Sequence, residues 1–406
     1  MNRNINFQSI IILFMYLYAF LIPIFDRSQS EKTGYYVFIL FLAGVGYLLA
    51  IVNIIKGRLR INKFHLLLSG IILFGLIGAL INFRDFDDLR SFFTLVYLGS
   101  FVFLVYQYLS QHNVMTMFVW YGIGTLVAFA LGGFGFGERL SDNELVNSTT
   151  YGYVSPYIVV FCFERFRCEN KTINKLLLMI VLLANLYLGI QTGTRTVFFL
   201  YGFVLLAYFI FYFNKQMTRQ SLILLLVIIP VIVFSISGYF KSIEYRLKLT
   251  FGSIAQNGLS EFLEHPEKYD YAVGYRIESI KTGLYIFRNN PFGIGFGNFS
   301  KYANLYMPSI YKAVGHPHNS YIEVLVSSGI GGTILSIIAL FYLFKRVRNN
   351  PLMLVIFIMV LIMNLTSTEI YHKMYILLFA SAQVLNSSTQ HAINQLTLNE
   401  VNLEKG

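Results

Sequence analysis

The chain has 406 residues, of which 56% are hydrophobic and only 13% are charged. A soluble protein carries about twice that charged fraction, and apolar runs close to the ~20 residues that cross a bilayer recur along the chain. The composition therefore excludes an ordinary soluble protein and predicts an all-α, polytopic integral membrane protein.

Twelve transmembrane helices are predicted from these apolar runs. Their centres lie near residues 15, 45, 73, 100, 124, 157, 181, 205, 229, 332, 358 and 380. The first run lacks a small-residue cleavage site after it and is interpreted as a retained helix rather than a signal peptide. Helices one to nine occupy 1–238, and helices ten to twelve occupy 319–386.

One long polar segment, 239–318, separates these two groups of helices, and a polar tail, 387–406, ends the chain. Within the long segment, residues 276–287 have a helical pattern that ends before Asn289-Asn290-Pro291. Two cysteines, near a predicted cytoplasmic boundary, predict neither a disulfide framework nor a Cys-based metal site.

Lys and Arg residues predict the orientation, because cytoplasmic loops of membrane proteins are enriched in them. With both termini in the cytoplasm, the inner loops account for the net charge of +11. The positive charge is thus a topology signal, and no nucleic-acid partner is predicted. The segment 239–318 then forms one long extracytoplasmic loop.

The strongest candidate site lies where this loop returns to the membrane, at His316-Pro317-His318-Asn319. Gly329 and Gly332 follow, and on a helix they would share a face that lets another helix approach closely. Structural hydrogen bonds of interfacial histidines are the alternative. His318 is favoured for catalysis and His316 for a supporting role.

Arginines at the same outer face are the second set of candidates. Arg195 lies in a short turn between two apolar helices, with no acid nearby in sequence, so it is either functional or paired with lipid phosphate. Arg276 precedes a glycine-rich run that includes Gly293 and Gly295, whose amides could bind phosphate. Arg139 lies in an outer loop beside two acids that could simply pair with it.

Glu323 is a carboxylate inside an apolar span, four residues after Asn319. Such a residue is a functional candidate by default, although pairing with an arginine is equally consistent with the sequence. The acidic run 85–88 resembles a metal-binding pattern but supplies too few oxygens for a good site, and His316 and His318 lack a clear third zinc ligand. No metal and no cofactor are predicted.

The chemistry of these residues points to a phosphate substrate at the outer membrane surface. The guanidinium fork binds phosphate oxygens in bidentate fashion, and a histidine can take a proton from a hydroxyl group near neutral pH. Together they predict the transfer of a group from a lipid-linked phosphate or pyrophosphate to an acceptor hydroxyl.

Three motifs resemble the O-antigen ligase and O-antigen polymerase superfamily. They are His318-Asn319 with Gly329 and Gly332, Arg195 in Thr192-Gly193-Thr194-Arg195, and Arg276 before Pro291-x-Gly293-x-Gly295. The order of about twelve transmembrane helices, with a long outer loop after the ninth, is similar too. The resemblance implies a GT-C-like fold and an inverting, metal-independent glycosyltransferase of the bacterial inner membrane.

The same resemblance implies the roles of the site residues. Arg195 and Arg276 would hold the pyrophosphate of an undecaprenyl-pyrophosphate-linked oligosaccharide, and His318 would orient or deprotonate the acceptor. The residues expected to bind substrate are Arg139, His316, Asn319, Glu323, Gly293 and Gly295. A chain-length regulator and a flippase are candidate partners, besides membrane lipid.

Several functions stay open at this point. The glycine-rich run favours a polymerase of O-antigen, capsule or exopolysaccharide over an O-antigen ligase that transfers glycan to lipid A core. A transporter or flippase of lipid-linked sugars would place its charges along a midplane cavity and show repeated halves. A membrane-bound acyltransferase would normally meet its acyl donor on the cytoplasmic side.

Overall fold

The computed structural model describes residues 7–25, 63–85, 109–131, 148–192, 195–212, 271–307 and 316–366, with isolated residues between them. All the elements in the described part of the chain are α-helices, so the predicted all-α class is confirmed. They are α1 (Phe7–Phe25), α3 (Lys63–Ile81), α5 (Gln111–Leu131), α6 (Ser148–Cys168), α7 (Thr172–Gln191), α8 (Arg195–Tyr212), α10 (Tyr271–Asn289), α11 (Phe299–Tyr306), α12 (Ser320–Val347) and α13 (Pro351–Thr366).

Four of the described helices, α3, α5, α7 and α12, are long and apolar enough to cross a membrane. Helices α1, α8 and α13 contain shorter apolar stretches, and α6 covers a further predicted span. The protein is therefore an integral membrane protein. The predicted spans near 45, 100, 229 and 380 lie outside the described residues, so the count of twelve stays a prediction.

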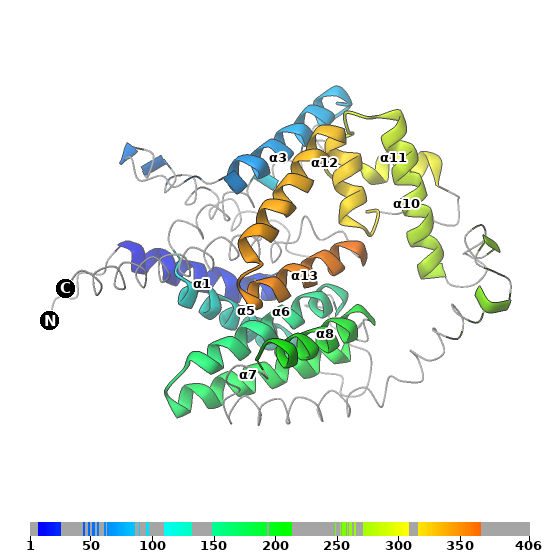
Figure 1. Cartoon of the computed structure of the whole chain (residues 1–406). Coiled ribbons are helices and arrows are strands. Elements are labelled where there is room, and N and C mark those ends of the chain that lie inside the picture. Colours follow the sequence, from blue (N-terminus) through cyan, green and yellow to red (C-terminus); the bar gives the residue numbers. More distant parts are fainter. Residues whose placement is uncertain are drawn as a thin grey trace, which may run out of the picture.

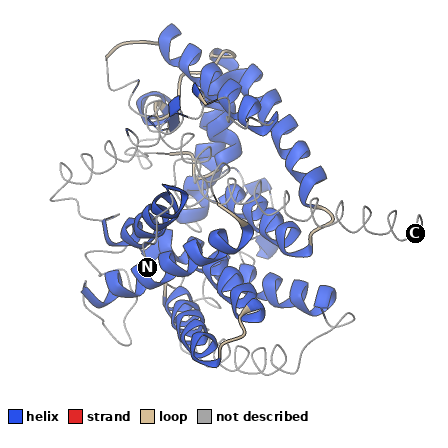
Figure 2. Cartoon of the chain, turned by 90° about the vertical axis from the view of Figure 1, so that its left-hand side faces the viewer, coloured by secondary structure: helices blue, strands red, loops and turns tan. Residues whose placement is uncertain are grey.

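Two groups of helices are visible in Figure 1. Helices α1, α5, α6, α7, α8 and α13 form a bundle whose core is rich in aromatic and branched side chains, and Figure 2 shows the same helices from a second direction. Stacked rings of Phe118 and Phe161, 4.0 Å apart, join α5 to α6 at its centre. Helix α3 lies outside this bundle and packs along α12.

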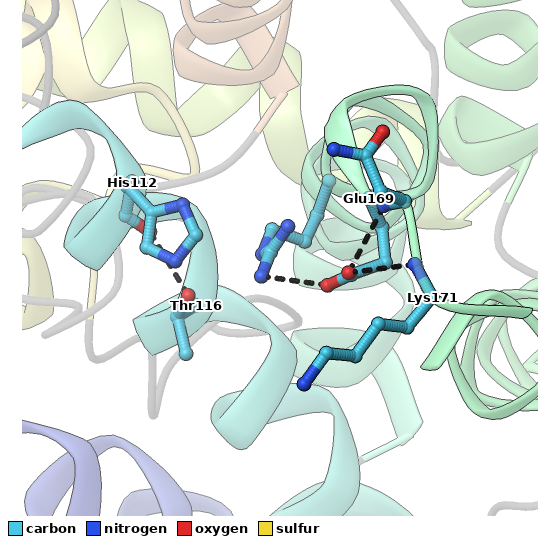
Figure 3. A network of polar contacts seen from close by, with 6 residues as sticks. His112, Thr116, Glu169 and Lys171 are labelled. Carbon is cyan, nitrogen blue, oxygen red and sulfur yellow. Dashed lines mark hydrogen bonds and ion pairs between the residues drawn. The ribbon is translucent and has the colours of Figure 1, made fainter. Parts of the chain in front are cut away.

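A polar network fixes one end of the bundle, at the turn between α6 and α7 (Figure 3). Arg165 forms an ion pair of 2.9 Å with Glu169. The backbone N–H groups of Asn170 and Lys171 donate hydrogen bonds to the same carboxylate. The Lys171 N–H in particular holds the pKa of Glu169 below its usual value. This end carries the basic residues that the sequence assigns to the cytoplasm.

Helix α12 is broken at Gly329, whose φ of 61° and ψ of −161° are non-helical. The second part of α12, 330–347, runs along α3, where the ring of Phe74 lies against Gly331 and its Cβ lies near Gly332. The first part, 320–328, turns away and packs against α10. The sequence predicts a continuous helix with close approach at Gly329 and Gly332. Close approach is observed. At Gly329, however, a loop inserts into a break in α12, instead of a second helix packing across a continuous helical face.

The loop in this break comprises residues 291–297, the glycine loop. The Ile294 and Gly295 N–H groups donate to the carbonyls of Val326 and Ser327, and the Ile330 N–H donates to Pro291. Unpaired backbone groups are costly away from water, so these bonds permit both the loop and the break. The predicted helix at 276–287 is confirmed as part of α10, which ends at Asn289.

A small second core forms around the glycine loop. Helices α10 and α11 and the first part of α12 contribute to it, and its buried residues are Ile286, Ile294, Phe299, Tyr302, Ala303, Met307 and Val326. The Tyr302 hydroxyl donates to Asn82 at the end of α3, and Asn82 donates to the Gly293 carbonyl. We call this unit the α10–α11 cap, because it covers the end of α3 and the break in α12.

We predict that Gly293→Ala destabilises the protein. Gly293 has a φ of +90°, and an added Cβ would lie 2.5 Å from the Ser327 carbonyl oxygen. A strained backbone of this kind costs about 1–3 kcal/mol, so the midpoint of thermal unfolding in detergent should fall by several degrees. The matched control is Gly202→Ala in α8, where an added Cβ would meet nothing within 4 Å. An equal midpoint for both variants would contradict the packing role of the glycine loop.

Candidate functional site

His318 lies close enough to Arg276 for the guanidinium charge to act on its imidazole. His318 immediately precedes the cap of α12, and Arg276 lies in the second turn of α10. The rings of His318 and Tyr275 are in edge contact, with centroids 5.1 Å apart. The positive charge of Arg276 acts on the imidazole. Residues 42 positions apart in sequence therefore come close together on the α10–α11 cap, and their shared role in a site stays a prediction.

The backbone of His318 is in the left-handed region, with φ of 50°. Among the described residues, no other non-glycine residue has a positive φ. Such conformations cost free energy and occur often at functional sites. The turn at His318 lets the chain leave the loop and enter α12 within two residues, and it leaves the imidazole exposed at the surface of the cap.

The environment of His318 favours the neutral imidazole. Partial burial, followed by the charges of Arg276 and His316, lowers the pKa of His318 to about 4. The side chain keeps an exposed side, and its ring packs on Tyr275. At pH 7 the imidazole is then neutral, as a proton acceptor must be, and the lowered pKa makes it a weaker base than a free histidine.

Asn319 caps the N-terminus of α12. Its side-chain oxygen accepts hydrogen bonds from the N–H groups of Tyr321 and Ile322, at 3.0 and 3.1 Å. Its side-chain NH₂ donates to the carbonyl of Leu365 in α13. Asn319 is buried, and these protein partners give it a structural role. Its predicted contact with substrate stays a prediction.

Glu323 lies one turn further along α12 and is 0% exposed. Its carboxylate accepts hydrogen bonds from the Ser327 hydroxyl at 2.9 Å and from the Gly297 N–H at 3.5 Å. The structure thus places Glu323 in the first part of α12, under the glycine loop. The amides of Gly293 and Gly295 bind the carbonyls of Asn290 and Ser327, so neither amide faces outward. A substrate contact of these three residues stays a prediction.

Arg195 is the first residue of α8, and its side chain is not among those that the structure describes. The turn before it is anchored by Thr192, whose hydroxyl donates to the Gly189 carbonyl. The Tyr201 hydroxyl of α8 donates a hydrogen bond to the Ser155 hydroxyl of α6, and both hydroxyls lie against Gly189 of α7. Buried hydroxyl pairs of this kind hold adjacent helices together in membranes, so the start of α8 is fixed against α6 and α7.

The remaining predicted residues are His316 and Arg139. His316 is exposed and lies close to His318, and its charge helps to lower the pKa of His318. Arg139 lies outside the described residues. In the described part of the chain no three His, Cys, Asp or Glu side chains gather into a metal-binding group. Asp85, from the acidic run considered above, forms an ion pair with Lys301 of α11.

Sequence reasoning missed two tyrosines at this site. Tyr275 packs against His318, and Tyr321 donates from its hydroxyl to the Leu361 carbonyl of α13. The chain has 29 tyrosines, so tyrosine alone carries little signal. Only the positions of these two, one next to Arg276 and one in the first turn after Asn319, could have indicated them.

The structure describes a helical membrane protein in which His318 lies within electrostatic range of Arg276. Residues 177–337 match the family model described as O-antigen ligase. This match contains Arg195, Arg276 and His318, and it confirms the predicted resemblance to the O-antigen ligase and polymerase superfamily. The function is accordingly of the O-antigen ligase or polymerase type, and the family implies a lipid-linked oligosaccharide substrate. No curated protein matches the chain.

The lowered pKa of His318 gives a prediction for its reaction with diethyl pyrocarbonate, which modifies only neutral imidazole. Modification of His318, followed by mass spectrometry of its peptide, should stay constant as the pH falls from 8 to 5 and halve near pH 4. N-acetylhistidine in the same tube should halve near its ordinary pKa of about 6.5. Arg276→Gln should move the midpoint of His318 upward, because a positive neighbour is removed. A midpoint near 6.5 in the unmodified protein would contradict the proposed environment.

Proposed function

We propose that this protein is an inverting, metal-independent glycosyltransferase with a GT-C-like fold. It polymerises undecaprenyl-pyrophosphate-linked oligosaccharide repeat units into O-antigen, capsule or exopolysaccharide. Its site would face outward from the bacterial cytoplasmic membrane, with both termini inside. The proposal is supported by the family match across 177–337 and, above all, by the position of His318, which is in ring contact with Tyr275 and within electrostatic range of Arg276.

The proposed chemistry is a single displacement at the anomeric carbon of the donor glycan. The neutral imidazole of His318 takes the proton of the acceptor hydroxyl, and the acceptor oxygen forms the new bond to the anomeric carbon. The bond from that carbon to the pyrophosphate oxygen breaks, and the electron pair leaves with undecaprenyl pyrophosphate. Attack opposite the leaving group inverts the configuration.

The arginines have a separate role in this scheme. Negative charge grows on the pyrophosphate as its bond to the sugar breaks, and fixed positive groups stabilise it in the transition state. Arg276 lies close enough to His318 to affect its ionisation, so the donor phosphate and the acceptor hydroxyl can meet between α10 and α12. Arg195 would contribute a second guanidinium from the start of α8.

The other predicted residues complete the proposed substrate site. His316 is exposed and could contact the acceptor. Arg139, Asn319, Glu323, Gly293 and Gly295 are retained as candidate substrate contacts from the resemblance. The last four bind other parts of the protein in this structure, which supports an indirect contribution to the site. A chain-length regulator and a flippase are proposed as partners in the same membrane.

An O-antigen ligase is the second candidate function, because the matching family model is described by that name. The two activities use the same donor and differ in the acceptor. A polymerase joins the glycan to another lipid-linked repeat unit, and a ligase joins it to lipid A core. The histidine and the arginines would serve either acceptor.

Reconstitution with a single substrate separates the two candidates. Purified protein would receive a lipid-pyrophosphate repeat unit and a chelator, with no other acceptor. We expect longer lipid-linked glycans, separated by electrophoresis or mass spectrometry, because a polymerase needs no second acceptor and no metal. Absence of product, with activity on addition of lipid A core, would instead establish a ligase.

Substitutions in the same assay test the assigned roles. His318→Ala and Arg195→Ala should reduce transfer to a low residual rate, and Arg276→Ala should lower the rate by about 10²–10³, the typical cost of one transition-state donor. The controls are His112→Ala at the start of α5 and Arg288→Ala at the end of α10, both distant from the site. Near-normal activity of His318→Ala, with normal membrane insertion, would refute the proposed mechanism.

A further inference from the structure

The first turn of α12 is attached to the end of α13 at two points. The Asn319 side-chain NH₂ donates to the Leu365 carbonyl at 3.3 Å, and the Tyr321 hydroxyl donates to the Leu361 carbonyl at 3.1 Å. Leu361 and Leu365 are four residues apart, so they lie one above the other on the same side of α13. The two bonds therefore fix both the position and the direction of the first turn of α12.

The two anchoring carbonyls lie in the last turns of α13 that the structure describes, and this description ends at Thr366. Asn319 binds the Leu365 carbonyl while its oxygen caps α12. Tyr321 is half-buried and reaches a carbonyl one turn deeper. Polar groups at this depth have little water to replace a lost partner.

Helix α13 also packs against α8, whose first residue is Arg195. Helix α13 is thus in contact both with the helix that carries Arg195 and with the turn that follows His318. No other described helix packs against both α8 and α12 to a comparable extent. The separation between the donor-binding arginine and the acceptor-binding histidine would then depend on how firmly α12 is held to α13.

We propose that Tyr321 is a positioning residue, which holds His318 in register with Arg195 by binding the end of α13. This proposal rests on the proposed function of His318 and Arg195. Tyr321 touches neither substrate nor imidazole in this scheme, and its hydroxyl acts through the first turn of α12. Displacements of about 1 Å in a reacting pair lower rates as much as 10²-fold, so loss of this one hydroxyl should be measurable in the rate of transfer.

The test is Tyr321→Phe in the reconstituted full-length protein, with the lipid-pyrophosphate repeat unit as donor and acceptor. We expect kcat to fall about 10-fold or more, within the range for displaced reacting groups, with little change in the KM of the donor. The matched control is Tyr302→Phe in α11. Its hydroxyl makes a similar bond of 3.0 Å, to Asn82, on the side of the cap that faces α3. Tyr302→Phe should keep a near-normal kcat at a similar thermal midpoint.

A double-mutant cycle with His318→Ala separates positioning from stability. If Tyr321 acts through His318, Tyr321→Phe should not lower the residual transfer of the His318→Ala protein any further. Equal losses in both backgrounds, or equal losses for Tyr321→Phe and Tyr302→Phe, would overturn the proposal and leave the role of His318 intact. Normal activity of His318→Ala would instead refute the proposed function itself.

Discussion

The structure of the site depends on one constraint, namely that every backbone group at the break in α12 must find a hydrogen-bond partner without water. Gly329 interrupts the helix, and the glycine loop supplies partners on both sides of the interruption. Glycines are needed here because the two backbones approach too closely for a Cβ atom. With the break satisfied in this way, the first part of α12 can turn away from α3 and run towards the end of α13.

This change of direction is what brings the candidate residues together. The first part of α12 forms a core with α10 and α11, and α10 carries Arg276. The N-terminus of the same segment reaches α13, where Asn319 fixes it. His318 is therefore held between two elements, the ring of Tyr275 on one side and the end of α13 on the other.

Part of the fold is predictable from the sequence for clear physical reasons. Apolar length and the charge pattern predict spans without knowledge of tertiary contacts, and α10 was predicted by its periodicity and its terminal proline. The pairing of His318 with Arg276 came from the family resemblance. The break at Gly329 could not be predicted, because glycine spacing alone does not distinguish a helix crossing from a loop inserted into a helix.

The roles of the buried polar residues were harder to predict for a related reason. Asn319, Glu323 and Gly295 occupy positions that look functional in sequence, yet each binds another part of the protein. Whether an amide or carboxylate meets substrate or backbone depends on contacts between segments far apart in the chain. Tyr321 was missed for the same reason, since its partner lies 40 residues away.

The central claim is that a lipid pyrophosphate binds between Arg276 and Arg195, within reach of the neutral His318. The most direct measurement is an experimental structure of the protein in lipid nanodiscs with undecaprenyl pyrophosphate bound. The account predicts phosphate density in contact with both guanidinium groups and an open path from His318 to the site of bond cleavage. Pyrophosphate bound at the opposite end of the bundle, near the Arg165–Glu169 ion pair, would contradict it.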